Sequence, residues 1–177
     1  MFGYELDNKQ IGETVKFEII RNKKKIDVVY KVKNSKALIP YEFESKPKYI
    51  IFGGLGFSPL TANYLVKLGG SARDINLMLY KDQKTDEVTQ RVVWLQKIFP
   101  HKINRGYYSS AYIVSKVNGI KIKDFNHFVN IIDNNKDEYT VIDFVENTKV
   151  VLKTKEARDS FEQIKNTFGI KSDRLVN

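Results

Sequence analysis

A cluster of glycines follows a short apolar run in the first half of the chain and is suited to bind a ligand through its backbone. Glycine adopts positive φ at little cost and lets a ligand approach the main chain closely. Successive free N–H groups could converge on an anion such as a carboxylate. The spacing equally suits a tight turn between two buried strands, so both interpretations stay open. The cluster and its flanking residues are Gly53, Gly54, Leu55, Gly56 and Phe57.

The sequence contains few signs of phosphate binding, nucleophilic catalysis or metal binding. A phosphate-binding loop continues into Lys-Ser or Lys-Thr, whereas Ser58-Pro59 follows the cluster here. No serine stands in a small-residue turn of the kind that nucleophiles need, and His101 and His127 are interpreted as ordinary surface or boundary residues. The chain has no cysteine, and no His, Asp and Glu cluster has metal-ligand spacing. We therefore expect no catalytic residue, no metal and no cofactor in this chain.

Alternating apolar and polar residues predict strands on both sides of the glycine cluster. Such alternation gives one apolar and one solvated face. A hairpin is expected over residues 14–32 with its turn at Asn22-Lys23, and Asn118-Gly119 is a strong signal for another. Further strands are expected at residues 49–52, 92–99, 112–117, 139–145 and 149–153.

Helices are expected over residues 61–68, 72–80, 124–134 and 154–168. Thr61, Ser71, Asp124 and Thr154 are suited to cap their N-terminal ends, and Gly169 is suited to end the last one. The apolar face of the helix that begins after Asp124 holds Phe125, Phe128, Val129 and Ile132. Together these elements predict an α+β domain with a small, partly open β-barrel.

The composition limits the kinds of partner that the chain is expected to bind. The net charge of +9 over 177 residues would suit nucleic acid if the cations clustered on one face. The lysines are scattered, and the run Lys23-Lys24-Lys25 falls at an expected hairpin tip, where solvation is the simpler explanation. No apolar run reaches the roughly 18 residues that span a bilayer, and residues 1–7 lack the pattern of a signal peptide. We expect neither nucleic acid nor a membrane as partner; a basic nucleic-acid-binding domain is the distant alternative, and the compartment is left open.

Several motifs resemble one family. Gly54-Leu55-Gly56-Phe57 resembles the carboxylate-binding loop of PDZ domains. Residues 114–122 resemble the strand, Asn-Gly turn and strand of the same fold, and the helix at 124–134 stands where the PDZ groove helix follows. Three segments, 49–61, 103–107 and 168–174, are similar to the last PDZ domain in the Deg branch of HtrA-type serine proteases. The likeness covers about residues 38–174.

This resemblance implies a PDZ-like domain over residues 38–177, with an inserted helical segment at about 61–90. Residues 1–37 would be a β-hairpin from the end of a preceding PDZ domain, plus a linker. The implied role is substrate handling or oligomer assembly in a trypsin-like serine protease, without hydrolysis by this chain. Expected partners are protein or peptide C-termini, or neighbouring protease subunits, including homo-oligomers. The implied peptide-binding residues are the glycine cluster with its flanks (Gly53, Gly54, Leu55, Gly56, Phe57) and the helix face (Phe125, Phe128, Val129, Ile132).

Two departures favour an alternative in which the groove is blocked and the domain serves assembly only. Pro59 falls where the groove strand should begin, and proline has no N–H to give to an added strand. The segment at 61–90 could cover or fill the groove. The hairpin face of Val15, Phe17 and Ile19 would then seek a partner surface.

Overall fold

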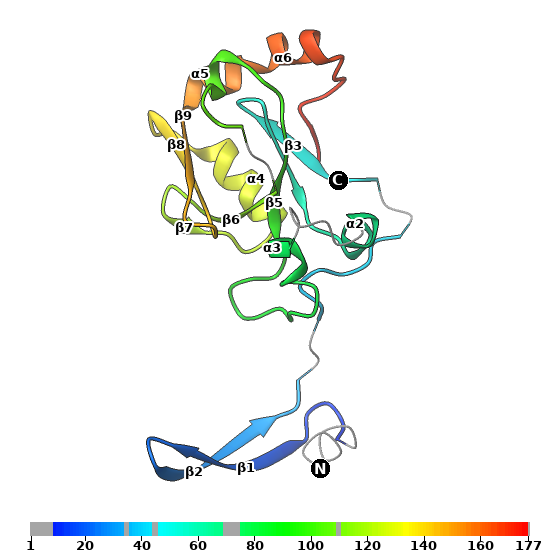
Figure 1. Ribbon diagram of the computed structural model, residues 1–177, viewed down its shortest axis with the longest axis vertical. Helices are drawn as coiled ribbons and strands as arrows, with labels where there is room; N and C mark the ends of the chain where they lie inside the picture. The colour runs from blue at the N-terminus through cyan, green and yellow to red at the C-terminus, as the bar shows by residue number, and fades with distance from the viewer. Residues whose placement is uncertain (1–8, 34–35, 44–45, 69–74, 109–110, 177) are drawn as a thin grey trace. The chain divides into compact units, whose positions relative to one another are not determined.

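The computed structural model describes residues 9–33, 36–43, 46–68, 75–108 and 111–176. The chain forms two compact units, Met1–Lys36 and Ala37–Asn177, and Figure 1 shows the elements of each. Gly69, Gly70 and Ser71, which the sequence predicts to end one helix and begin the next, lie outside the described residues.

The first unit contains one antiparallel hairpin, β1 (Thr14–Arg21) with β2 (Lys24–Lys31). Asn22 and Lys23 join the strands with φ values of 52° and 62°. Two consecutive left-handed residues make the type I′ turn that suits the twist of a two-residue hairpin. The hairpin predicted over residues 14–32 and its turn are confirmed.

The second unit is built on an eight-stranded sheet whose order is β10-β3-β4-β5-β6-β8-β9, with β7 paired to β6. Every pairing in it is antiparallel, and the sheet does not close on itself. With its helices, this open sheet confirms the predicted α+β, PDZ-like class. The strands are β3 (Tyr49–Phe52), β4 (Leu55–Pro59), β5 (Val93–Ile98), β6 (Tyr112–Val117), β7 (Ile120–Lys121), β8 (Tyr139–Phe144), β9 (Lys149–Lys153) and β10 (Arg174–Leu175).

The described helical segments are α2 (Ala62–Leu68), α3 (Ile75–Met78), α4 (Phe125–Asn134), α5 (Thr154–Asp159), α6 (Phe161–Phe168) and the 3-10 turn η2 (Lys102–Asn104). The Asp124 carboxylate accepts a hydrogen bond from the His127 N–H at 2.8 Å, so the predicted cap of α4 is confirmed. The Thr61 hydroxyl likewise accepts from the Tyr64 N–H at 3.4 Å, before α2. None of the helices among these segments has the length and apolar character needed to cross a bilayer.

Two predicted helices differ from the structure. The last is interrupted at Ser160, which separates α5 from α6. Thr154 is the first helical residue rather than the cap, and its hydroxyl lies 2.9 Å from that of Thr140 in the buried interior. A buried hydroxyl needs a hydrogen-bond partner, and here a distant strand supplies it. The helix predicted to reach Tyr80 ends earlier, since α3 stops at Met78.

The second unit has two apolar clusters: one includes residues of β3, β4 and β5, and the other includes Trp94 of β5 from the opposite face of the sheet. Successive strand residues point to opposite faces, so Leu55 and Phe57 join the cluster that contains α4, here called the inner face. Trp94 joins the other cluster with Leu65 of α2 and Leu77 of α3, here called the outer face. Helices α2 and α3 therefore pack against Trp94 on the side of β5 opposite to α4.

Candidate functional site

The glycine cluster forms the turn between β3 and β4. Phe52 pairs with Leu55, and the two residues between them, Gly53 and Gly54, have φ values of 57° and 77°. The conformation is a two-residue hairpin of the type I′ class. Of the two interpretations that the spacing left open, this geometry corresponds to a tight turn between buried strands.

Close packing accounts for both turn glycines as well. A Cβ atom on Gly53 would lie 2.5 Å from Leu152 Cδ1, and one on Gly54 would lie 2.4 Å from Asn104 Nδ2 and 2.6 Å from the Phe99 carbonyl oxygen. These approaches are shorter than any atom pair tolerates, so a side chain would force the neighbours to move. The space beside the turn is occupied by the chain itself.

Asn104, which is almost fully buried, stabilises the turn through side-chain hydrogen bonds. Its Nδ2 donates to the Gly53 carbonyl at 2.8 Å and to the Phe99 carbonyl at 2.9 Å, and its Oδ1 accepts from the His101 N–H at 3.0 Å. The Gly53 N–H donates to the Ala157 carbonyl at 3.3 Å. The Gly53 N–H and carbonyl groups, and the Gly54 carbonyl, which accepts from the Phe99 N–H at 2.7 Å, thus have partners within the chain.

The predicted ligand-binding strand, β4, lies between two partners. Phe57 pairs with Ile50 of β3 on one side and with Leu95 of β5 on the other. In an antiparallel sheet the backbone N–H and C=O groups of a strand point alternately towards its two neighbours. Along Leu55 to Phe57, where β4 is paired on both sides, a peptide could therefore add only if β3 or β5 left it.

The predicted helix face meets the predicted strand, as the resemblance implies. The rings of Phe57 and Phe128 are 4.9 Å apart between centroids, and both side chains are fully buried. Phe125, Val129 and Ile132 belong to the same buried cluster. The structure brings the glycine turn and α4 into one core, and their own side chains fill the seam between them. The carboxylate-binding role of Gly53 to Phe57 stays a prediction.

Two arginines fix the C-terminal end of α4. Arg158 donates to the Ile132 and Asn135 carbonyls, each at 2.8 Å, which satisfies carbonyl groups left free at a helix end. Arg174 of β10 contacts the Asp133 carboxylate at 2.7 Å. The hydrogen bond to Asp133 raises the pKa of the Arg174 guanidinium above its usual value. These contacts restrict movement of α4 away from the sheet.

The two histidines have structural contacts. His101 caps η2 and lies 2.7 Å, Nε2 to Oε1, from Gln163, and His127 Nδ1 accepts from the Lys123 N–H at 3.2 Å. Within the described parts of the chain, no three His, Cys, Asp or Glu side chains gather closely enough to hold a metal ion.

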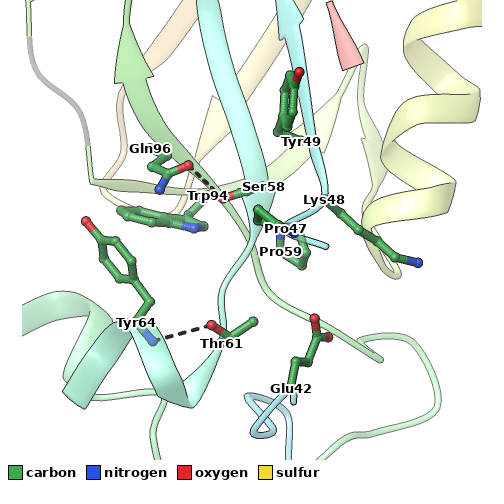
Figure 2. Close-up of a pocket in the computed structure, with 10 residues that line it drawn as sticks. All are labelled: Glu42, Pro47, Lys48, Tyr49, Ser58, Pro59, Thr61, Tyr64, Trp94 and Gln96. Atoms are coloured by element: carbon green, nitrogen blue, oxygen red, sulfur yellow. Dashed lines mark hydrogen bonds between the residues drawn. The ribbon is translucent and has the colours of Figure 1, made fainter. Parts of the chain in front are cut away.

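The outer face holds a cavity that the sequence did not reveal. It has a volume of about 320 Å³, and Figure 2 shows Tyr49 of β3, Ser58 of β4, Tyr64 of α2, and Trp94 and Gln96 of β5 around it. These side chains come from four elements. The available signal was the position of the single tryptophan and Gln96 two residues apart on one strand, which places both on one face.

Comparison with known proteins identifies the class. A family model described as "PDZ domain" matches residues 39–175. A "Serine protease DegP homolog" of Plasmodium falciparum is 36% identical over 137 residues, which are 76% of this chain and 15% of that protein. "Protease Do-like 2, chloroplastic" of Arabidopsis thaliana is 29% identical over 181 residues, 99% of this chain and 30% of that protein.

The chain therefore belongs to the PDZ domain family, in the form carried by Deg/HtrA-type serine proteases, and it spans less than a third of the length of either relative. The predicted family is confirmed. As a PDZ domain the chain is a protein-interaction module, whose partners in general are proteins or peptides.

Proposed function

We propose that this chain is a non-catalytic assembly module of a Deg/HtrA-type serine protease rather than a receptor for free C-termini. The pairing of β4 on both sides supports this most directly. PDZ ligands bind as an added strand, and the predicted carboxylate-binding residues Leu55 to Phe57 have a neighbouring strand on each side and so no edge to offer. The internal contacts of the Gly53-Gly54 turn add to the argument, because a carboxylate would have to replace them.

The hairpin offers the surface for assembly. The register pairs Val15 with Tyr30, Phe17 with Val28, and Ile19 with Ile26, so all six side chains lie on one face. Ile19 and Ile26 are each 40% exposed. Contiguous exposed apolar side chains mark protein interfaces. We propose that this hairpin is the end of a preceding PDZ domain and that its apolar face is covered within the assembled protease.

Self-association of the chain tests this proposal. At about 100 μM, where contacts of micromolar strength are populated, sedimentation should show species larger than the monomer. The double substitution Ile19→Thr with Ile26→Thr keeps β-branched residues in the strands and should return the chain to a monomer. Ile20→Thr is the matched control, because Ile20 is exposed on the opposite face of the same hairpin.

A wild-type chain that stays monomeric at this concentration would contradict the assembly role. Equal association of the Ile19→Thr, Ile26→Thr variant and the wild type would place the interface elsewhere and remove the role given to the hairpin.

Capture of C-terminal peptides is the second candidate, favoured by the contact between Phe57 and Phe128 that joins the two predicted halves of the groove. Titration with a library of peptides that have free C-termini separates the two functions. We expect no saturable binding at the glycine turn. Binding at micromolar strength that is lost when the terminal carboxylate is amidated would replace the assembly proposal with peptide capture.

A further inference from the structure

Gly56 differs from the two turn glycines, because it lies inside β4, where the pairing with β5 shifts register between Gly56 and Phe57, and its backbone does not need positive φ. It is absent from the residues with positive φ. A Cβ atom at this position would meet the Lys97 carbonyl oxygen at 3.4 Å and the Phe99 ring at 3.5 Å, which are ordinary van der Waals contacts. An alanine would fit, and a glycine inside a strand is weakly unfavourable. The absence of a side chain at Gly56 also leaves space beside the strand, because Gly56 lines a cavity there.

Above Gly56 is a second cavity on the outer face, with a volume of about 450 Å³. It adjoins the cavity of Figure 2, since both are lined by Tyr49, Tyr64 and Gln96. The two cavities form one groove along β4, from Pro59 at one end to Gly56 at the other; we call it the outer groove. Their volumes fall in the range of pockets that hold ligands in proteins.

The walls of the outer groove are aromatic, with a few polar groups. The Tyr64 ring packs on Trp94 with centroids 4.5 Å apart, and the side chains of Ser58 and Gln96 meet at 3.3 Å, Oγ to Oε1. Figure 2 shows Trp94 between Tyr64 and Gln96, and the Glu42 carboxylate at the end near Pro59. Aromatic surface with sparse polar groups favours extended peptides that insert apolar side chains.

The charges around the outer groove are unbalanced towards positive. Glu42 is neutralised by Arg91 at 3.2 Å, Oε1 to Nη2. Lys97 lies at the Gly56 end with its Nζ 4.9 Å from the Phe99 ring centroid, and Lys48 lies at the rim near Pro59. Among the described residues, neither lysine forms a salt bridge. Complementary charge selects partners, so the groove suits an anionic ligand.

We infer that the outer groove binds an extended acidic segment of another protein, with large apolar side chains seated above Gly56 and beside Trp94. Alternate side chains of an extended chain point the same way, so residues two apart in such a segment can enter the two cavities. Acidic residues between them would lie near Lys97 and Lys48. This site shares no lining residue with the Gly53-Gly54 turn or with the hairpin, and it does not depend on the assembly proposal.

Fluorescence of the single tryptophan provides the test, because Trp94 lines the groove. The probe is an end-blocked peptide of about eight residues in which aspartate alternates with leucine or phenylalanine, long enough to span roughly 26 Å. We expect a saturable change in Trp94 emission that weakens with added salt. Blocked ends exclude carboxylate capture, so this result is independent of the C-terminal peptide titration.

Three peptides and three variants isolate the groove. A peptide with lysine in place of aspartate should bind about tenfold more weakly or not at all, and so should one with alanine in place of the apolar residues. Gly56→Val, which fills the cavity, and Lys97→Glu should each weaken binding about tenfold. Lys116→Glu on β6 is the matched control, since it changes net charge equally at an exposed position outside the groove, and it should bind as the wild type does.

Equal binding of the alanine peptide would show attraction to net charge alone and would overturn the inference. Equal loss in Lys97→Glu and Lys116→Glu would do the same. Absence of binding both by fluorescence and by calorimetry at about 1 mM peptide, the weak end of measurable affinity, would also overturn it. Circular dichroism checks the fold of each variant, and Lys97→Glu keeps the test valid if Gly56→Val does not fold.

Discussion

The two faces of β3, β4 and β5 are built from the same three strands but are completed differently. On the inner face, α4 seals the sheet with Phe128 against Phe57, and both rings are fully buried. On the outer face, Tyr64 of α2 packs on Trp94 of β5, and the outer groove lies beside this pair. In this PDZ domain the face that carries the family resemblance is packed like a core, and the face on which α2 packs is the one with cavities.

Substitution of Phe128 is expected to have the largest effect on stability, because this residue is central to the inner face. Phe128→Ala removes a fully buried aromatic ring on the inner face and should lower the free energy of unfolding by about 3–5 kcal/mol, as large-to-small core substitutions do. Denaturant unfolding measures the change. Val66→Ala on α2 is the control for the other face, since Val66 is 63% exposed and should change stability by less than ~0.5 kcal/mol. Similar losses in both variants would mean that the inner face is not the main source of stability.

Gly54 and Gly56 compare a tightly packed position with an open one within the same β3–β4 hairpin. Gly54→Ala must adopt a φ of 77° and meet Asn104 and Phe99, so it should cost about 3 kcal/mol in the free energy of unfolding. Gly56→Ala meets only ordinary contacts and should be neutral or stabilising by about 0.5 kcal/mol. Thermal and denaturant unfolding of the two variants side by side would check this. A Gly56→Ala variant as unstable as Gly54→Ala would mean that the fold requires Gly56, and Gly56 would no longer support the outer groove.

The parts of the fold that could be predicted from sequence are those decided by neighbouring residues. Asn22-Lys23 and Asn118-Gly119 adopt positive φ at their turns, and Asp124 caps α4 by bonding the third residue along. Each outcome depends on contacts within a few positions. The meeting of the glycine cluster and α4 was also predicted, but through resemblance to a family and not through the spacing of the residues.

The features that could not be predicted from sequence depend on contacts between residues far apart in the chain. Thr154 does not cap the helix as expected, because its hydroxyl forms a hydrogen bond with that of Thr140, which is 14 residues away. The sequence marks Asn104 only as part of the segment 103–107 that resembles the family, yet its side-chain amide donates hydrogen bonds to both the Gly53 and the Phe99 carbonyl. Tyr107 bonds the Val151 N–H at 3.0 Å on β9, a strand at one end of the sheet, where an unpaired edge would otherwise invite other strands. The outer groove escaped prediction for the same reason, since its walls come from four elements.

The smallest expected effect concerns the turn at Asp86, between α3 and β5. Hydrogen bonds from the Thr89 and Val88 N–H groups lower the pKa of Asp86 below its usual value. A lowered folded-state pKa means that the carboxylate stabilises this turn above the unfolded-state pKa, and that the contribution is lost as pH falls through the folded-state pKa. Asp86→Asn should therefore loosen the turn at neutral pH and leave it like the acidified wild type, with unfolding of the inner face unchanged. Amide hydrogen exchange at Thr89 and Val88, followed against pH with Phe128 as the inner reference, measures this. Equal change at both places would show that the two faces respond as one unit.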